Sequence, residues 1–551
     1  MKKSPRYPRF RSLLPCLLLA IPSGGLAAPG DADASFGTAG AGAVTVAFTT
    51  GNDLAYGMTV QPDNRILLAG STSAGDFALC RLQANGSLDA GFGTAGKVVH
   101  SFGQFELARG VAVRPDGRIL AGGSGLIAGG SRDFAVIRCL PNGSLDPQFG
   151  TGGIATTDIQ GGFNDTAYCM AVQTDGKIIV AGSHRSGVAM ARYTANGALD
   201  AAGFGTGGKV FSSVVNGEEE QANAIVVQPD GRIVVAGEFR AVAGSAFLLS
   251  RYLADGSPDP SFGTGGKSVI PISAGTDRDI ANGLYLLADG KFLVAGTAAQ
   301  DFALVRCTAQ GQLDPGFGTG GIVLIDFGGT TDAGTGVAVQ TDGKVLLAGT
   351  TRISGREYFA LIRLTATGDV DTAFGPYGGA ALTALTAGND TARSIAIQSD
   401  GKILLGGDAG LLNNKDFGVA RYESGVRGLT ALESWRRTYF GVTTGTGSAA
   451  DDADPEKDGV TNITEFGFGL NPAVPDGNLL PQPQFAGGAC SLTFAEPWGI
   501  SGVSYMVEWS STLAAGSWLP IPNTAVGPAH SHAVSLAGKH RFFHRVRVTN
   551  P

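Results

Sequence analysis

The sequence is poor in charged residues and in long apolar runs. Charged residues make up 16% of the 551 residues, and the formal net charge is −7 with a pI near 5.5. Nucleic-acid-binding surfaces need clustered lysine and arginine, and no dense basic run follows the first dozen residues, so we exclude nucleic acid as a partner. After the first 28 residues no apolar stretch approaches the length of a membrane span, so we expect no transmembrane segment.

Cysteine and histidine are too few and too scattered for the usual thiol or metal sites. Five cysteines follow residue 28, an odd number with no CxxC motif. Cys80, Cys139 and Cys307 occur in the same kind of apolar strand in three different repeats, so we expect buried free thiols. Among the histidines, only His100 and His184 fall within the repeats, in different copies, which argues against a histidine metal site or triad there.

The amino terminus has the pattern of a secretory signal peptide. Five basic residues among the first 11 precede a short apolar stretch, Leu13–Ile21, and small residues near Ala28 offer a cleavage site. The stretch is too short for a membrane span and is interrupted by Pro15. We therefore predict a signal peptide over residues 1–28 and a mature protein that is secreted, extracellular or at the cell surface.

Glycine is abundant, at 86 residues, and it recurs with a period. A Phe-Gly pair occurs seven times at intervals of 55 to 58 residues. The seven phenylalanines are Phe36, Phe92, Phe149, Phe204, Phe262, Phe317 and Phe374. About 25 residues after each pair come two apolar segments joined by a tight-turn signal, as at Asp116-Gly117. Asp-Gly tolerates the positive φ of such a turn, so each copy predicts a β-hairpin.

Each copy ends with one more apolar strand. Together with the strand after Phe-Gly and the two strands of the hairpin, this gives four strands per repeat. Units of this size cannot bury both faces alone, and stacking them around an axis hides most strand edges. We therefore predict an all-β fold in which residues 29–425 form a seven-bladed β-propeller. A β-solenoid is the alternative, although its rungs are usually shorter and need no hairpin.

The copies resemble the delta-60 repeat family, a glycine-rich repeat of bacterial exported proteins. Its members read Leu-Asp-x-x-Phe-Gly-Thr-Gly-Gly and then Gln-x-Asp-Gly-Lys-Ile, as residues 145–153 and 173–178 do here. Two copies depart from the pattern: Asn64 replaces the turn glycine in the first, and Pro376 follows Phe-Gly in the seventh. The resemblance implies a propeller-like β array and transfers no catalytic residues.

Three polar positions recur in all seven copies. The last strand carries an arginine: Arg81, Arg138, Arg192, Arg251, Arg306, Arg363 and Arg421. An aspartate precedes Phe-Gly: Asp33, Asp89, Asp146, Asp200, Asp259, Asp314 and Asp371. An acid precedes the hairpin: Asp53, Glu106, Asp165, Glu220, Asp279, Asp332 and Asp390. One substrate rarely needs seven equivalent sites, so we expect arginine and one acid to pair and tie strand to turn. The alternative is an acidic ring that binds a cation or a polyhydroxylated ligand.

The repeat stops after residue 425, where a helix is predicted with Thr430 as its N-cap. An acidic loop follows, and counting from Gly459 as position six gives oxygen donors at positions 1, 3, 5, 7, 9 and 12. These donors are Asp454, Glu456, Asp458, the Val460 carbonyl, Asn462 and Glu465. Calcium takes about six to eight oxygen ligands, so the spacing predicts a structural Ca²⁺. The alternative is an acidic flexible linker.

The loop resembles dockerin-type or thrombospondin-type calcium loops, although glutamate at its third position, Glu456, is unusual. Residues 426–480 are thus predicted as helix and calcium loop, and residues 481–551 as a small β-sandwich. Its tryptophans, Trp498, Trp509 and Trp518, offer either a carbohydrate-stacking face or core packing.

The combined pattern favours a monomeric, non-enzymatic binding or scaffold protein that presents propeller loops to an extracellular protein or glycan. The alternative is a secreted glycan-active enzyme with acids converging at the propeller funnel. Paired carboxylates within about 5 to 10 Å on one face would favour the enzyme.

Overall fold

The computed structural model describes residues 27–549 apart from 38–39, 127–129, 213–217, 243, 274–276, 427–429, 441–443, 459, 469, 471, 473–479, 487–488, 497–502, 513–516, 525–528 and 536–542. Residues 1–26 of the predicted signal peptide and Gly459 of the predicted calcium loop lie outside the described residues. The chain divides into two compact units, residues 1–428 and 429–551, and each is described by itself.

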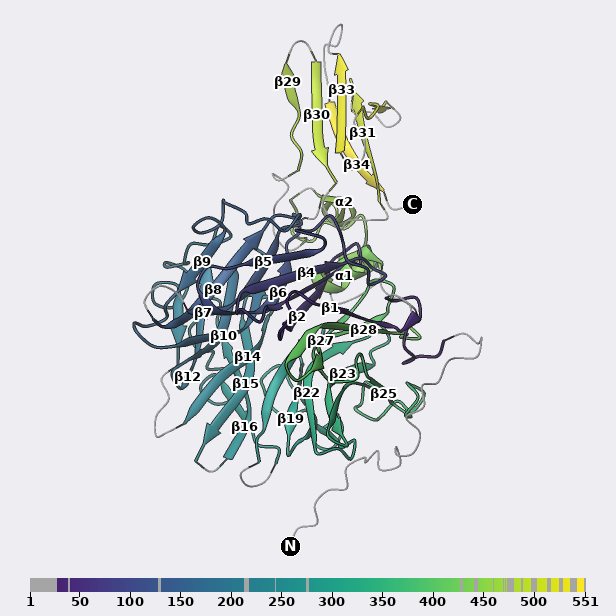
Figure 1. Ribbon diagram of the computed structural model, residues 1–551. Coiled ribbons are helices and arrows are strands. Elements are labelled where there is room, and N and C mark those ends of the chain that lie inside the picture. Colours follow the sequence, from purple (N-terminus) through teal and green to yellow (C-terminus); the bar gives the residue numbers. More distant parts are fainter. Residues whose placement is uncertain are drawn as a thin grey trace. The chain divides into compact units, whose positions relative to one another are not determined.

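Seven four-stranded antiparallel sheets form the first unit and are the blades of a propeller (Figure 1). The predicted all-β, seven-bladed fold is therefore confirmed. Within a blade the strands follow one another as a meander, and the innermost strands of neighbouring blades contact one another around the axis.

The strands have the following bounds. The innermost strands are β2 (Leu54–Val60), β6 (Gln104–Val113), β10 (Asp165–Val172), β14 (Glu219–Val227), β18 (Ile280–Leu286), β22 (Thr331–Val339) and β26 (Asn389–Ile397). The second strands are β3 (Ile66–Ser71), β7 (Ile119–Leu126), β11 (Ile178–His184), β15 (Ile233–Ala241), β19 (Phe292–Ala298), β23 (Val345–Ile353) and β27 (Ile403–Leu411). The third strands are β4 (Phe77–Leu82), β8 (Arg132–Cys139), β12 (Gly187–Tyr193), β16 (Gly244–Tyr252), β20 (Asp301–Cys307), β24 (Arg356–Leu364) and β28 (Asn414–Tyr422). The outermost strands are β5 (Lys97–His100), β9 (Ile154–Thr157), β13 (Lys209–Phe211), β17 (Lys267–Ile270), β21 (Ile322–Ile325), β25 (Ala380–Thr383) and β1 (Ala43–Val46).

The hydrophobic core of the propeller lies between blades. Seven clusters of buried side chains each combine residues from two adjacent blades in the described part of the chain. The phenylalanine of each Phe-Gly pair is almost fully buried in these clusters. The glycine that follows it has a positive φ, 53° at Gly93, where a Cβ would lie 2.1 Å from the Lys97 carbonyl oxygen. The Phe-Gly pair therefore combines a core anchor with a turn that accepts only glycine.

Ring closure joins the two ends of the propeller sequence. The strand after each Phe-Gly pair is the outermost strand of the preceding blade, so each sequence repeat is divided between two blades. The strand after the first pair, β1, therefore completes the last blade by pairing antiparallel with β28, with Ala43 opposite Ala420.

Asn64 lies at this closure. Its φ of 63° is the left-handed conformation that glycine adopts in the other copies and that asparagine tolerates. Its Oδ1 accepts hydrogen bonds from the N–H and hydroxyl of Ser399, both at 2.9 Å, and its carbonyl accepts one from Gln398. The departure from the repeat pattern thus joins the first blade to the last.

The second unit contains helix α1 (Ala431–Phe440), the 3₁₀ helix η2 (Gly447–Ala449), helix α2 (Asn462–Phe468) and two three-stranded sheets. The sheets are β29 (Gln484–Ala486), β30 (Ala489–Ala495) and β33 (Ala529–Ser535), and β32 (Leu519–Pro520), β31 (Ser504–Ser510) and β34 (Phe543–Thr549). Thr430 and Glu433 exchange hydrogen bonds between side chain and backbone, so the predicted N-cap is confirmed as part of a capping box.

Both sheets of the second unit contribute to one small core. Trp509 packs against that core, while the Arg545 guanidinium lies 4.2 Å from the ring centre of Trp518. Trp498 lies outside the described residues. For Trp509, core packing is therefore the alternative that the structure shows.

The thiol prediction is confirmed, because Cys80, Cys139 and Cys307 are buried and free. Among the described residues, no helix has the length and apolar character needed to cross a membrane.

Candidate functional site

The meander gives each blade two different ends. We call one the Phe-Gly end, which carries the Asp-Gly turns and the Phe-Gly turns. We call the other the hairpin end. It carries the turns between second and third strands, which are not the Asp-Gly turns, and the loops that lead to the next innermost strand. Both names follow from the strand order within the sheets.

At the Phe-Gly end, each repeated arginine pairs with the aspartate that precedes Phe-Gly. The pairs are Arg81–Asp89 (2.7 Å), Arg138–Asp146 (2.9 Å), Arg192–Asp200 (2.9 Å), Arg251–Asp259 (2.8 Å), Arg306–Asp314 (2.8 Å), Arg363–Asp371 (2.8 Å) and Arg421–Asp33 (2.6 Å). Burial alone would oppose ionisation, but hydrogen bonds and neighbouring cations lower the pKa of all seven aspartates, that of Asp33 to about 2. The expected tie between strand and turn is therefore present in every blade.

The same arginines also reach the next blade. Arg251 donates from Nη1 to the Ala309 carbonyl of the following blade at 2.6 Å, and its Cζ lies 4.6 Å from the ring centre of Phe262. Equivalent contacts recur in the other six blades. Each guanidinium thus fixes a turn and a neighbouring blade at once, which accounts for its repetition without a ligand.

The acids that precede the hairpins have a different role at the hairpin end. Asp53 is fully buried and accepts hydrogen bonds from the N–H groups of Phe48 and Thr49, at 2.6 and 2.7 Å. Asp390 does the same for Leu385 and Thr386. These acids therefore hold the loop that leads from one blade to the next, and they do not pair with the repeated arginines.

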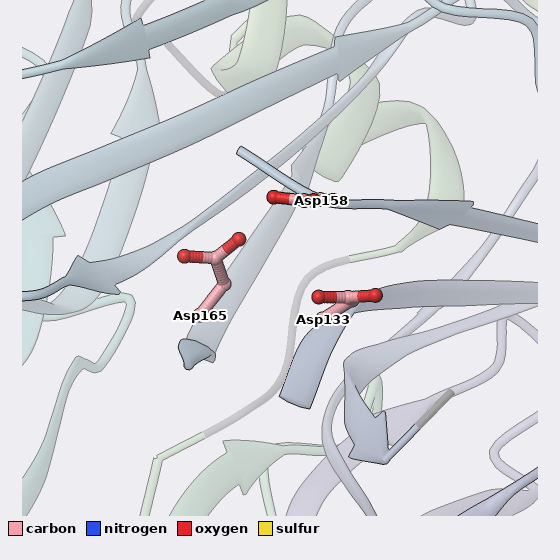
Figure 2. Close-up of side chains that lie close together, drawn as sticks. All are labelled: Asp133, Asp158 and Asp165. Atoms are coloured by element: carbon pink, nitrogen blue, oxygen red, sulfur yellow. The ribbon is translucent and has the colours of Figure 1, made fainter. Parts of the chain in front are cut away.

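Beside each of two such loops, three carboxylates lie close together. Asp133, Asp158 and Asp165 come from three separate segments at one boundary between blades, and each offers an oxygen within 4.8 Å of the others (Figure 2). Burial raises the pKa of Asp133 and Asp165, and the charge of Asp158 raises both further. Asp301, Asp326 and Asp332 repeat this arrangement three blades later. Both are acidic triads that can hold a metal ion.

His184 adjoins the first triad. Its Nδ1 lies 2.5 Å from an oxygen of Asp165, and its buried ring packs edge-on against Phe163 and Phe211. Sequence analysis placed the two propeller histidines in different copies and missed the pairing of His184 with Asp165. These two residues are 19 positions apart, and only strand pairing between β10 and β11 brings them opposite each other.

In the second unit, the predicted calcium loop brings several of its ligands together. Asp454, Glu456 and Asp458 each offer an oxygen within 4.8 Å of the others, and the buried Glu465 interacts with Glu456. Burial raises the pKa of Glu456, and the charges of Asp458 and Asp454 raise it further. This cluster is a third acidic triad that can hold a metal ion.

Two predicted ligands of this loop have other contacts. The Asn462 amide donates to the carbonyls of Ser448 and Ala450, both at 2.7 Å, while its Oδ1 is buried without a hydrogen-bond partner among the described residues. Val460 donates its N–H to Asp458 at 2.9 Å. The backbone therefore folds back on the carboxylates, and helix α2 begins at Asn462.

The innermost strands carry a further set of residues, which sequence analysis missed. Each has a β-bulge that leaves one residue unpaired, and we call these seven residues the bulge ring: Tyr56, Arg109, Tyr168, Asn223, Asn282, Thr335 and Arg393. The bulge is shared by all blades, but its side chain is not. The position is defined by strand pairing alone, so only a comparison of the repeats in register could have revealed it.

Three of the seven bulge-ring residues have a structural role. Asn223, Asn282 and Thr335 hydrogen-bond the backbone carbonyls of Ala281, Gly334 and Ala392 on the next innermost strand, at 2.9 to 3.1 Å. The other four residues alternate between tyrosine and arginine around the axis. The Arg109 Cζ lies 4.7 Å from the ring centre of Tyr56 and 4.9 Å from that of Tyr168, and Arg393 lies 4.9 Å from that of Tyr56. Here the sevenfold equivalence of the blades is broken.

Comparison with known proteins identifies the repeat. A family profile described as a domain of unknown function (DUF5122) beta-propeller matches residues 61–92, 114–149, 173–202, 228–262, 287–317, 340–374 and 398–425. The chain therefore carries this beta-propeller repeat domain over residues 61–425. No curated protein matches the chain at a significant level.

Solved propellers resemble the chain at low identity. U3-55K is 10% identical with a TM-score of 0.39, covering 71% of this chain and 99% of that one. Sqt1 from Chaetomium thermophilum is 12% identical with a TM-score of 0.38, covering 69% and 99%. YCF48 bound to D1 peptide is 12% identical with a TM-score of 0.39, covering 73% and 99%. Similarity at this level carries no information on function.

Proposed function

We propose that this DUF5122 propeller protein is exported and acts outside the cell as a monomeric, non-enzymatic binding or scaffold protein. One observation carries the proposal: the polar residues shared by the repeats have partners within the fold, as in the seven arginine–aspartate pairs. What remains for a partner are the loops that differ between blades.

Exposed apolar side chains at the hairpin end support a partner there. Phe105, Phe163, Val242, Leu411 and Leu412 are 43 to 93% exposed, and all lie in or beside hairpin-end loops. Exposed apolar groups favour association, because contact with a partner removes them from water. We propose an extracellular protein or glycan as that partner.

The test compares the two ends of the propeller. Intact mature protein is presented to immobilised glycans and to extracellular proteins, beside a Leu411→Ser/Leu412→Ser variant and a Leu88→Ser control. Leu88 is also exposed, at 38%, but lies at the Phe-Gly end. We expect the double variant to lose retention and the control to keep it. Product formation from any glycan, or the protein in the cytoplasmic fraction, would contradict the proposal.

The alternative, a glycan-active enzyme, is favoured only by the spacing of the acidic triads. Asp165, in the first triad, and Asp332, in the second, have 0 and 1% of their surface exposed. Each already accepts a backbone hydrogen bond, from Ile159 and Phe327 respectively. Carboxylates buried and bonded in this way support loop anchoring better than substrate contact.

For the second unit we propose that the loop around Asp454 binds a structural Ca²⁺. The carboxylates of Asp454, Glu456 and Asp458 meet, and Glu465 interacts with Glu456. Burial and the neighbouring negative charges raise the pKa of Glu456, and a divalent cation would relieve this repulsion. The ion would order the loop and helix α2, without a catalytic step.

Tryptophan fluorescence can follow this binding, because the ring centre of Trp435 lies 5.8 Å from that of Phe466 in α2. We expect Ca²⁺ to release or absorb heat in calorimetry and to raise the unfolding midpoint of the second unit. Asp458→Asn should abolish both effects, whereas Asp451→Asn, outside the predicted ligand set, should preserve them. Absence of both effects in the unaltered protein would remove the site.

A further inference from the structure

Arg109 differs from the other members of the bulge ring in having an unbalanced charge. Arg393, at the same position in the last blade, pairs with Asp408 at 2.6 Å, and Asp408 also binds Lys415. No described carboxylate lies within ion-pair distance of Arg109, and none of its N–H groups has a hydrogen-bond acceptor among the described residues. Its Nε is buried in this state.

The side chains around Arg109 hold its guanidinium in place but offer no acceptors for its hydrogen bonds. The rings of Tyr56 and Tyr168 lie on either side, at 4.7 and 4.9 Å from Cζ. Such contacts offset part of the cost of a half-buried cation, but they accept none of its hydrogen bonds in the plane of the guanidinium. Burial lowers the pKa of Arg109, and the charge of Arg393 lowers it further. An arginine fixed at this position with free N–H groups is prepared for an external acceptor.

A carboxylate matches this group better than other anions. Its two oxygens fit the planar fork of a guanidinium, and its single charge balances the single unpaired charge. A polyanion is disfavoured, because the chain has a net charge of −7. We propose that Arg109, between Tyr56 and Tyr168, binds the carboxylate of a ligand at the propeller axis.

This inference rests on the proposed binding function and gives the ligand its chemistry. The carboxylate belongs to a uronic acid or to an amino-acid chain end, and both are tested as small molecules. Isothermal titration of the full mature protein uses galacturonate, which carries one carboxylate, beside its methyl ester, and a tripeptide with a free carboxyl end beside its amide. We expect one carboxylate probe to bind and its neutral counterpart to bind at least tenfold more weakly.

Two arginine variants then locate the site. Arg109→Gln should weaken the binding of the carboxylate probe at least tenfold, and Arg109→Lys should weaken it less, because the charge remains without the fork. Arg393→Gln is the matched control, since it removes an arginine from the same bulge position whose charge Asp408 already balances; its affinity should stay within about threefold. Circular dichroism and the unfolding midpoint establish that each variant is folded.

The proposal is overturned if neither carboxylate probe binds, if the neutral forms bind equally well, or if folded Arg109→Gln keeps its affinity. These outcomes are distinct from a failure of the proposed function. A protein that retains its partner through Leu411 and Leu412 while ignoring both probes is a binding protein without this site, whereas a protein that fails both tests has neither.

Discussion

Removing one repeated arginine should destabilise the whole propeller. In Arg251→Ala, the Asp259 carboxylate, with 3% of its side chain exposed, loses its principal partner, and the Ala309 carbonyl loses the donor that joins two blades. Breaking a buried ion pair from one side costs about 3–5 kcal/mol. Arg232 remains 3.2 Å from Asp259 and offsets part of this cost. We therefore expect the free energy of unfolding to fall by about 2–3 kcal/mol, and by less in Arg251→Lys.

The assay can follow the two units separately. All four tryptophans, at positions 435, 498, 509 and 518, lie in the second unit, so their fluorescence reports on that unit during urea unfolding. Far-UV circular dichroism is dominated by the strands of the propeller. Arg251→Ala should shift the second signal to lower urea and leave the first unchanged.

The matched control is Glu219→Ala, which removes an exposed pair with Arg240 at 2.8 Å and should change stability by less than about 0.5 kcal/mol. If Arg251→Ala stayed within about 0.5 kcal/mol of the unaltered protein, the arginines would not hold the blades together. Their repetition would then need another explanation, such as a ligand at the Phe-Gly end.

Three further predictions concern charge and closure. The aspartates paired with arginine have pKa values below the ordinary 3.8, about 2 at Asp33, so the stability that they contribute is complete above about pH 4. As the pH is lowered from about 4 to about 2, the unfolding midpoint followed by circular dichroism should decrease. The opposite sign applies to Asp133, whose raised pKa costs stability as pH rises past the ordinary carboxyl value. In chelator-containing buffer, Asp133→Asn should therefore raise stability at pH 7 by up to about 1 kcal/mol, with the gain absent below pH 4. Asn64→Gly keeps the turn but loses the Ser399 hydrogen bonds, and urea titration should show a loss of about 1 kcal/mol.

Local signals predicted the fold well. The positive φ at Gly93 and the buried ring of Phe92 both belong to a single turn. Both can therefore be predicted from the local Phe-Gly sequence. We expected each repeated arginine to pair with an acid, but the sequence did not show which of the two repeated acidic positions supplies it. Asp259 and Glu220 are equally acidic in sequence, and only the meander places the first beside Arg251.

Pairing between distant segments could not be predicted in the same way. The pattern that the seven repeats share is the same whether a blade begins at Phe-Gly or at the hairpin, so the sequence leaves the blade boundary undetermined. The bulge ring was missed for a related reason. Arg109 and Tyr168 look like ordinary strand residues until the register shift between Ala108 and Gly110, and its counterparts, place them together.

The pairing of β1 with β28 has a consequence for how the protein is made. Strand β1 is among the first parts of the chain to be synthesised, yet its partner is completed only some 375 residues later. Until then its edge is open, and the last blade cannot exist in any form. Every boundary between blades, including this one, is also crossed by the chain itself. In a propeller that lacks its final repeat, β1 would therefore have no partner strand. The ring can close only after the last blade has been synthesised.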